Sequence, residues 1–281
     1  MVTFIRGNFY FGLRMQNSST ISLLLNKMVE HYGLLFSDKI ITNNSPARDE
    51  ILKRLGKRKD VDVQLLYNNI PPMSIREEED VHQTRDKYGI PGNAKVLVTA
   101  GILTSGKNIE ILLRCLPKIG IESLYLLIVG DSYTESDRHN KATLKALSNE
   151  LNIEKQVIFT GWLEKEELWK SYLASDLFVL PSISEGMPNA MLEALGVNLP
   201  CFGSRIPGVR DILQYDELMF DPQGEKALTN KIQNFFTEKQ FSGKVKRLCQ
   251  ARKEVFSFDW KEKVFQLVTE RTLGRSKGVE R

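Results

Sequence analysis

From residue 95 onward one pattern repeats, and it limits the fold more than any other feature: a short continuous apolar run, a turn with Gly or Pro, and a longer segment of helical period. Continuous apolar runs are typical of parallel strands covered on both faces. The alternation therefore predicts a doubly wound α/β domain. The predicted strands are 96–99, 124–129, 157–160, 177–180, 199–202 and 217–220. The predicted helices are 109–116, 142–151, 164–174, 189–196 and 225–237.

The first 75 residues follow the same logic in a shorter form, with strands predicted at 2–5, 39–42 and 63–67 and helices near 19–31 and 45–55. A stretch with two prolines at 68–72 is typical of a linker, because Pro bars helix and stiffens the chain. An acidic helix is predicted from residue 77 to Gly89, and a last helix at 259–273. We therefore expect a partial N-terminal α/β domain at 1–75, a complete C-terminal domain at 76–258, and a separate terminal helix at 259–281.

Composition excludes several classes of protein. With 281 residues, 42% apolar and 26% charged, the chain is too apolar to be disordered and long enough for two domains. No apolar stretch approaches the length that spans a bilayer, and the N-terminus lacks the pattern of a signal peptide, so we expect a cytoplasmic protein. The three cysteines are far apart, which predicts reduced core residues rather than a disulfide framework or a thiolate metal site.

The net charge of +4 is concentrated in the first 75 residues, which hold 10 Lys or Arg against 6 Asp or Glu. Much of this excess is the basic cluster Lys53, Arg54, Lys57, Arg58 and Lys59. One interpretation is a solvated helix end whose cations suit the helix dipole. The other is a peripheral contact with anionic lipid head groups at the inner face of the membrane. The cluster is small and has no interleaved aromatic residues, which argues against nucleic acid as a partner.

In an open parallel sheet, ligands bind beyond the carboxyl ends of the strands. The turn after the first strand of the larger domain, from Gly101 to Asn108, nearly matches the phosphate-binding pattern GxxxxGK[ST]. Asn108 stands where a magnesium-binding hydroxyl is required, so a P-loop NTPase is not expected. Lys107 is expected to face a phosphate; the alternative is a surface lysine beside a turn glycine.

The most informative segment follows the fourth strand of this domain: Pro181-Ser-Ile-Ser-Glu185-Gly-Met-Pro-Asn-Ala-Met-Leu-Glu193-Ala-Leu-Gly196. Pro188 suits the first turn of a helix and Gly196 its end. The amides of residues 186–189 could bind an anion or a cluster of hydroxyls at the helix start. Glu185 and Glu193 could each grip the vicinal hydroxyls of a sugar; the alternative for Glu193 is a helix-surface carboxylate.

This segment resembles the E-x7-E motif of retaining nucleotide-sugar glycosyltransferases of family four. The resemblance extends from Lys39 to the C-terminus, through four further motifs: 100–108, 128–131, 159–162, and 174–177 preceding Pro181 and Ser182. It implies the GT-B fold, two Rossmann-like domains with the donor held by the C-terminal one. It also implies metal-independent transfer with no cofactor besides the nucleotide-sugar donor, and a terminal helix that crosses back to the smaller domain.

The resemblance also assigns roles to residues. Lys107 and Glu185 would be catalytic, with Lys107 on the donor diphosphate and Glu185 on the transferred sugar. Glu193 would contact the ribose, and Trp162 with Leu163 the base. The remaining donor-binding residues it implies are Gly101, Gly130, Gly186, Met187, Pro188 and Asn189.

Two positions depart from the family pattern. Ile102 stands where the family usually has an arginine that shares the diphosphate with the lysine. The family also carries a histidine after an N-domain strand, and here the matching position is Arg6 or Gly7, so Arg6 is a possible site position. The triplet Asp60-Val61-Asp62 spells the DxD of metal-dependent glycosyltransferases, but it lies in a charged loop of the smaller domain, and no metal site is expected.

The implied function is transfer of a hexose from a nucleoside-diphosphate sugar to an acceptor hydroxyl with retention, in polysaccharide or glycolipid assembly. The alternative is a weakly active or inactive nucleotide-sugar-binding subunit. Against the family pattern the chain is short by about 100 residues at its N-terminus. Residues 1–75 would then form half of an acceptor domain, whose open strand edge predicts a partner chain or self-association.

Overall fold

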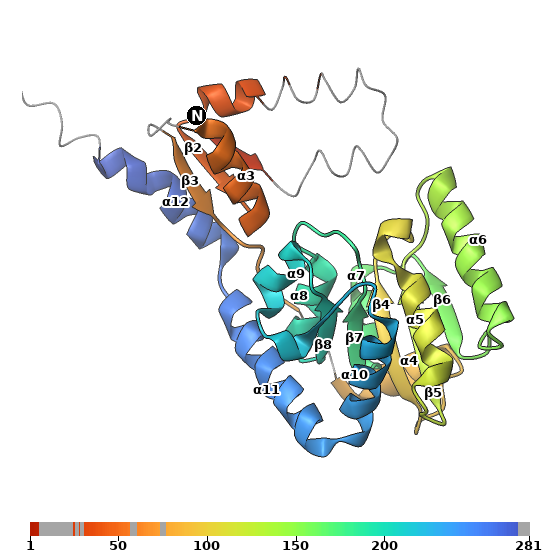
Figure 1. Cartoon of the computed structure of the whole chain (residues 1–281). Helices are drawn as coiled ribbons and strands as arrows, with labels where there is room; N and C mark the ends of the chain where they lie inside the picture. The colour runs from red at the N-terminus through yellow and green to blue at the C-terminus, as the bar shows by residue number, and fades with distance from the viewer. Residues whose placement is uncertain (6–24, 26–27, 29–30, 57–60, 74–76, 275–281) are drawn as a thin grey trace, which may run out of the picture. The chain divides into compact units, whose positions relative to one another are not determined.

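The computed structural model describes residues 1–5, 25, 28, 31–56, 61–73 and 77–274. Packing divides the chain into two compact units, residues 1–69 with 257–281 and residues 70–256. We call these unit 1 and unit 2 (Figure 1). The division falls at 69/70 and 256/257, a few residues before the boundaries expected from the sequence.

Unit 2 holds a six-stranded parallel sheet in the order β6-β5-β4-β7-β8-β9. In order of appearance along the chain this is 3-2-1-4-5-6, the order of a doubly wound dinucleotide-binding fold. The strands are β4 (Lys95–Ala100), β5 (Leu124–Val129), β6 (Val157–Gly161), β7 (Leu177–Leu180), β8 (Cys201–Ser204) and β9 (Met219–Phe220). The chain reverses direction across the sheet between β4 and β7, which places the switch point, and hence the expected ligand crevice, at their carboxyl ends.

Helices cover both faces of this sheet (Figure 1). One layer contains α5 (Ile109–Cys115), α6 (Glu135–Glu150) and α10 (Glu225–Thr237), in which α5 contacts both others. The other contains α4 (Glu77–Lys87), α7 (Lys165–Leu173) and α8 (Asn189–Gly196), in which α7 contacts both others. The chain also forms α9 (Pro207–Leu213), the short turns η1 (Ser105–Lys107), η2 (Leu116–Lys118) and η3 (Asp216–Leu218), and α11 (Lys239–Phe256), which packs against α8 and α10.

The sequence predictions for unit 2 agree with this fold, with local corrections. Strand β8 begins two residues later than predicted, after Pro200, and residues 216–218 form a 3-10 turn before a two-residue β9. Helix α6 begins seven residues earlier than predicted, because Thr134 and Asp137 form a capping box at its start. Helices α9 and α11 were not predicted. The cysteines Cys115, Cys201 and Cys249 are buried and free, as expected.

Unit 1 holds a three-stranded parallel sheet, β1 (Val2–Ile5), β2 (Lys39–Thr42) and β3 (Asp62–Leu65), in that order. Helix α3 (Ser45–Leu55) begins at the N-cap Asn44, whose side chain accepts from the Ala47 amide at 2.9 Å. Leu34, Ile40 and Ile51 form a small core on one face of the sheet. The predicted helix at 19–31 falls mostly outside the described residues; Leu25, Met28 and residues 31–36 are helical.

The terminal helix α12 (Trp260–Gly274) belongs to unit 1. Its Trp260 ring lies 6.2 Å from the ring of Phe4 in β1. Lys39 of β2 is buried; its ammonium pairs with Asp62 of β3 at 3.2 Å and donates to the Leu267 carbonyl of α12. Helix α12 therefore packs against β1 and β2 within unit 1.

Candidate active site

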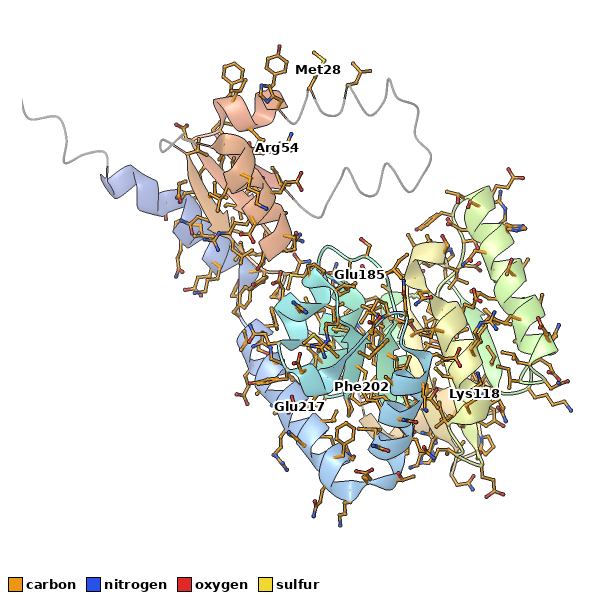
Figure 2. All side chains as sticks on the ribbon, in the orientation of Figure 1. Met28, Arg54, Lys118, Glu185, Phe202 and Glu217 are labelled. Atoms are coloured by element: carbon orange, nitrogen blue, oxygen red, sulfur yellow. The ribbon has the colours of Figure 1, made fainter. Side chains whose placement is uncertain are left out.

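The candidate site lies where the sheet order of unit 2 predicts it, at the carboxyl ends of β4 and β7. Lys107 ends the 3-10 turn that follows β4, and Glu185 lies in the loop between β7 and α8. The ammonium of Lys107 is 2.6 Å from Oε1 of Glu185. The same oxygen accepts from the hydroxyl of buried Ser182 at 2.7 Å. Two groups distant in the sequence are therefore joined at the switch point (Figure 2 labels Glu185).

Glycines at the strand ends create the room for this ion pair. Gly101 has φ +144°, and a Cβ on it would lie 3.0 Å from Cε of Lys107. The lysine chain therefore runs directly along the bare backbone of Gly101. Gly130 has φ +122°, and a Cβ there would lie 2.0 Å from the carbonyl oxygen of Gly101, so the ends of β5 and β4 touch through backbone alone.

Asn108 anchors the turn that follows β4. It adopts a left-handed conformation with φ 51°, which Asn tolerates better than most residues. Its side-chain amide donates to the carbonyls of Pro181 at 3.2 Å and Pro222 at 2.9 Å. The Ile183 amide donates to the Gly106 carbonyl at 2.9 Å. Asn108 therefore ties together the loops that follow β4, β7 and β9.

Helix α8 begins at Asn189, with Pro188 as its N-cap residue. Met187 and Pro188 are buried, whereas Asn189 is exposed. The backbone of residues 185–186 packs directly against Gly208 at the start of α9. A Cβ on Gly208 would lie 2.2 Å from the Gly186 carbonyl oxygen, so only glycine fits there. The sequence did not lead us to Gly208, although the Ile-Pro-Gly run after β8 could have indicated it.

Glu193 lies on α8, partly buried. Burial raises the pKa of its carboxyl, and Lys165 opposes the shift. The backbone carbonyl of Glu193 accepts from the Val197 amide at 3.3 Å, and no hydrogen bond or ion pair within the described residues involves its carboxylate. The side chain is therefore neither fully buried nor fully solvated at its position in α8.

Aromatic rings stand beside the ends of β5 and β6. Tyr133 and Trp162 are both exposed, and their ring centroids are 4.8 Å apart at 41°. The following Leu163 is half-buried. Sequence reasoning selected Trp162 and Leu163 but missed Tyr133, because a loop aromatic carries no periodic signal. Next to them Asp131 pairs with Lys141 at 2.6 Å, and that hydrogen bond lowers the pKa of the Asp131 carboxyl.

The remaining predicted positions are less informative. Ile102 is 36% exposed. Arg6 and Gly7 lie outside the described residues, as do Lys57, Arg58, Lys59 and Asp60. Asp62 of the Asp60-Val61-Asp62 triplet forms an ion pair with Lys39. In the part of the chain that the structure describes, no three or more His, Cys, Asp or Glu side chains gather where a metal ion could bind. No helix of that part is both long and apolar enough to cross a membrane.

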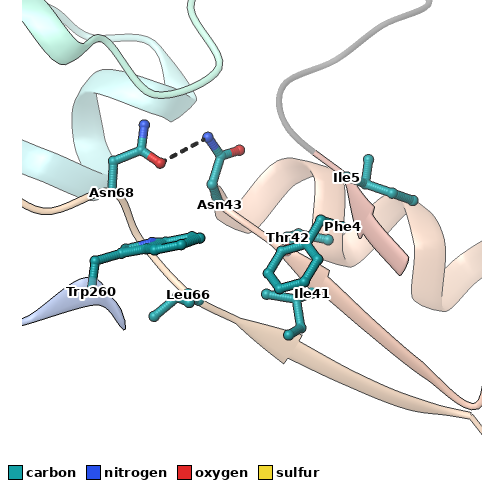
Figure 3. Close-up of a pocket in the computed structure, with 8 residues that line it drawn as sticks. All are labelled: Phe4, Ile5, Ile41, Thr42, Asn43, Leu66, Asn68 and Trp260. Atoms are coloured by element: carbon teal, nitrogen blue, oxygen red, sulfur yellow. Dashed lines mark hydrogen bonds between the residues drawn. The ribbon is translucent and has the colours of Figure 1, made fainter. Parts of the chain in front are cut away.

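A small hollow lies in unit 1 at the carboxyl ends of its three strands (Figure 3). It holds about 10 Å³, room for one water. It combines two aromatic rings with two side-chain amides, and the Asn43 amide donates to the Asn68 oxygen at 3.4 Å. Its lining residues are Phe4, Ile5, Ile41, Thr42, Asn43, Leu66, Asn68 and Trp260.

Comparison with known families identifies the class to which this chain belongs. The sequence profile described as "Glycosyl transferases group 1" matches residues 80–254, more than half of the chain. The chain belongs to this family of glycosyltransferases. Its most informative motifs, E-x7-E and the turn with Lys107, both fall inside the matched region.

Curated relatives point in the same direction. An uncharacterised glycosyltransferase of Methanocaldococcus jannaschii is 27% identical over 192 residues, 67% of this chain and 47% of the relative. The N-acetyl-alpha-D-glucosaminyl L-malate synthase of Bacillus anthracis is 26% identical over 69% of this chain and 48% of the relative. The chain thus spans about half the length of these relatives.

Solved structures confirm the fold as GT-B. Sucrose-phosphate synthase from Thermosynechococcus elongatus aligns with a TM-score of 0.73 at 22% identity, covering 97% of this chain and 68% of that one. HepE of Anabaena, solved with UDP and glucose, aligns with a TM-score of 0.77 at 17% identity, covering 96% and 71%. At these identities the likeness establishes the architecture alone.

Proposed function

We propose that the chain transfers a hexose from a nucleoside-diphosphate sugar to an acceptor hydroxyl, with retention of configuration. The observation that carries the proposal is the Lys107–Glu185–Ser182 cluster at the switch point of a group 1 glycosyltransferase domain. Lys107 would neutralise the departing diphosphate, the role that a preorganised cation performs well in a water-poor crevice. Glu193 would accept from ribose hydroxyls, and Glu185 from hydroxyls of the transferred sugar.

In the proposed reaction the bond between the sugar C1 and the diphosphate oxygen breaks, and a bond from C1 to the acceptor oxygen forms on the same face. The acceptor proton passes to the leaving diphosphate oxygen. Among the side chains of unit 2 that the structure describes, we identify none as an enzyme nucleophile for a covalent intermediate. The reaction needs no metal in this scheme, so transfer should persist in EDTA; loss of activity with EDTA and its return with Mg²⁺ or Mn²⁺ would overturn that part.

The base is proposed to lie against Tyr133 and Trp162. Two exposed aromatic rings beside the ends of β5 and β6 offer a stacking surface for a planar ring, and such stacking tolerates any base. The acceptor is proposed to contact unit 1, whose hollow combines the aromatic rings of Phe4 and Trp260 with the amides of Asn43 and Asn68. The relatives include a mannosyltransferase WbdA of Escherichia coli and a lipopolysaccharide core glycosyltransferase of Rhizobium meliloti, which supports a role in polysaccharide or glycolipid assembly.

A second candidate function is a nucleotide-sugar-binding subunit that needs a partner chain for turnover. Ile102 favours it, because an apolar side chain stands where the family usually supplies a second cation. Strand β1 also favours it: within the described residues β1 pairs only with β2, and its Val2 and Phe4 side chains are exposed. An open strand edge of this kind is a site for pairing with another chain.

One experiment separates the two functions. The purified chain is incubated with UDP-, GDP- and ADP-hexoses, and release of nucleoside diphosphate is followed with calorimetry of binding in parallel. Release that disappears in Glu185→Gln supports the transferase. Binding without release supports the subunit. The absence of both binding and release would refute the donor site itself.

A further inference from the structure

A second lysine–carboxylate pair lies at the same edge of the sheet as Lys107 and Glu185. The ammonium of Lys141, on α6, is 2.6 Å from Oδ1 of Asp131, which follows the end of β5. The side chain of Lys141 is 23% exposed, the same fraction as for Lys107, and that of Asp131 is 27% exposed. The pair is therefore partly withdrawn from water, unlike the solvated ion pairs of a protein surface.

Hydrogen bonds join the loop after β5 to the turn after β4. The two strands end level with each other, and beyond them the Leu103 amide donates to the Asp131 carbonyl at 3.0 Å. The Asp131 carboxylate accepts from the Ser132 amide at 2.8 Å as well as from Lys141. The carboxylate that holds the Lys141 ammonium is therefore itself fixed to the turn that ends in Lys107.

Helix α6 is attached to the same turn. The side-chain amide of Asn140 donates to the Leu103 carbonyl at 2.8 Å, and Lys141 is the next residue of the helix. Because α6 follows β5, its first turn lies at the carboxyl edge of the sheet. Long side chains of a helix lean toward its N-terminus, so Lys141 extends back toward this edge. Its ammonium is held at the crevice by two independent attachments of the surrounding backbone.

The pair lies between the groups proposed for the diphosphate and those proposed for the base. On one side, the hydrogen bond to Leu103 leads into the turn that ends in Lys107. On the other side, Tyr133 follows two residues after Asp131, and its ring stands against that of Trp162. A nucleotide that extends from Lys107 to these rings passes the end of β5, where the pair stands.

Charge balance in the crevice requires a second cation. Lys107 is the only Lys or Arg in the turn after β4, and the Glu185 carboxylate already pairs with it. A diphosphate carries more negative charge than one lysine balances, and ionised donors make the strongest hydrogen bonds to its oxygens. We propose that Lys141 is a second cation of the donor site and binds an oxygen of the donor diphosphate. Asp131 holds the ammonium in position until the donor binds.

This role of Lys141 rests on the donor site of the proposed function and is tested by calorimetry on the full chain. The probes are UDP, GDP and ADP, and then the nucleoside of the one that binds best. Lys141→Met should weaken binding of that diphosphate about tenfold, whereas Lys141→Arg should keep most of the affinity. The affinity for the nucleoside, measured by competition, should be the same in all variants, because it has no phosphate.

A double variant separates a direct contact from an indirect effect. Lys141→Met alone leaves the charge of Asp131 unbalanced, and that charge would repel a phosphate. Lys141→Met combined with Asp131→Asn removes both charges, and the Asn oxygen can still accept from the Ser132 amide. The double variant should still bind the diphosphate about fivefold more weakly than the wild type. Recovery of the wild-type affinity would assign the whole loss to Asp131 and overturn the proposal.

Lys145→Met is the matched control. Lys145 lies one turn further along α6 and is exposed, with its ammonium 5.6 Å from the centroid of the Phe159 ring. The substitution changes the charge of the same helix by the same amount but should leave the affinity for the diphosphate unchanged. An equal loss in Lys145→Met would reduce the effect to net charge. A loss of nucleoside affinity in Lys141→Met as large as that for the diphosphate would reveal a structural role. Either result would overturn the proposal.

The donor site and the role of Lys141 fail in different ways. If the wild type binds none of the three nucleotides, the donor site is refuted, and the role of Lys141 is refuted with it. If the wild type binds a diphosphate and Lys141→Met binds it equally well, only the role of Lys141 is refuted.

Discussion

The ion pair between Lys107 and Glu185 makes an unusual prediction about nucleotide affinity. Removing the carboxylate should strengthen binding of a nucleoside diphosphate, although the same change should abolish transfer. Without ligand, the Glu185 carboxylate pairs with the Lys107 ammonium at 2.6 Å. A bound diphosphate must therefore share the ammonium with this carboxylate or displace the carboxylate. Glu185→Gln keeps a side chain that accepts from Ser182 but removes the negative charge that competes with phosphate.

The magnitude follows from the burial of the pair. The side chains of Lys107 and Glu185 are 23% and 13% exposed, so the pair is neither a solvated nor a fully desolvated one. Unit charges about 4 Å apart interact by about 4 kcal/mol at an effective dielectric constant near 20, and desolvation offsets much of that. We expect a gain of about 1 kcal/mol, or about fivefold in affinity, for Glu185→Gln. Lys107→Met should lose a charge-assisted contact and weaken binding by about 2 kcal/mol, or about thirtyfold.

Calorimetry with the nucleoside diphosphate that binds the wild type best measures both changes. The matched control is the pair Lys244–Glu217, also at 2.6 Å but more exposed, at 50% and 38%. Glu217 precedes β9 and therefore lies at the amino end of that strand, away from the crevice (Figure 2). Glu217→Gln should leave affinity unchanged. If Glu185→Gln weakens nucleotide binding as much as Lys107→Met does, the competition between carboxylate and diphosphate is refuted.

Further predictions concern neighbouring residues. Asn108→Ala should destabilise the protein by about 2 to 4 kcal/mol in urea unfolding, and Asn108→Gly by about 1 kcal/mol less, because Gly restores the left-handed backbone but not the two hydrogen bonds; equal losses would contradict the backbone argument. Glu193→Gln should be more stable than the wild type at pH 7 and bind nucleotide more weakly. Because the pKa of Glu193 is raised in the folded state, ionisation of its carboxyl lowers the stability of the wild type above that pKa. The stability advantage of Glu193→Gln should therefore vanish as the pH falls below the ordinary value of 4.5. A stability advantage that stays constant across pH would show that it has another cause. Nucleotide should change the fluorescence of Trp162, and Tyr133→Ala should weaken binding about threefold to tenfold; a full signal in Trp162→Phe would place the base elsewhere. Gly130→Ala should lower both stability and nucleotide affinity, since its Cβ would meet the Gly101 carbonyl; wild-type affinity would refute the close contact.

The parts of the fold that could be predicted from the sequence are those with local periodicity. Continuous apolar runs such as 124–129 indicated parallel strands because both of their faces are buried. Helix α11 was missed although its buried residues Val245, Cys249 and Phe256 follow helical spacing, because buried Arg252 interrupts the apolar pattern. Strand β8 was placed too early because apolar Leu199 precedes Pro200 in the same run.

The candidate site was predictable as a set of motifs but not as a geometry. E-x7-E and the lysine turn are local patterns, so Lys107, Glu185 and Glu193 could be selected. Their pairing depends on β4 lying beside β7, which is decided by sheet order and not by either segment alone. The anchoring role of Asn108 depends likewise on loops that follow three different strands, so the sequence predicted only that Asn108 replaces the hydroxyl of the GxxxxGK[ST] pattern.

The contact of α12 with β1 and β2 has a consequence for biosynthesis. Residues 70–256 are contiguous and can fold while the ribosome still holds the remainder. Unit 1 cannot be completed until α12 has emerged, because its Lys39 is buried against the Leu267 carbonyl. Until then the ammonium of Lys39 lacks its carbonyl partner from α12. A nascent chain stalled before residue 257 would therefore present a complete unit 2 beside an incomplete unit 1, and docking of α12 would complete unit 1.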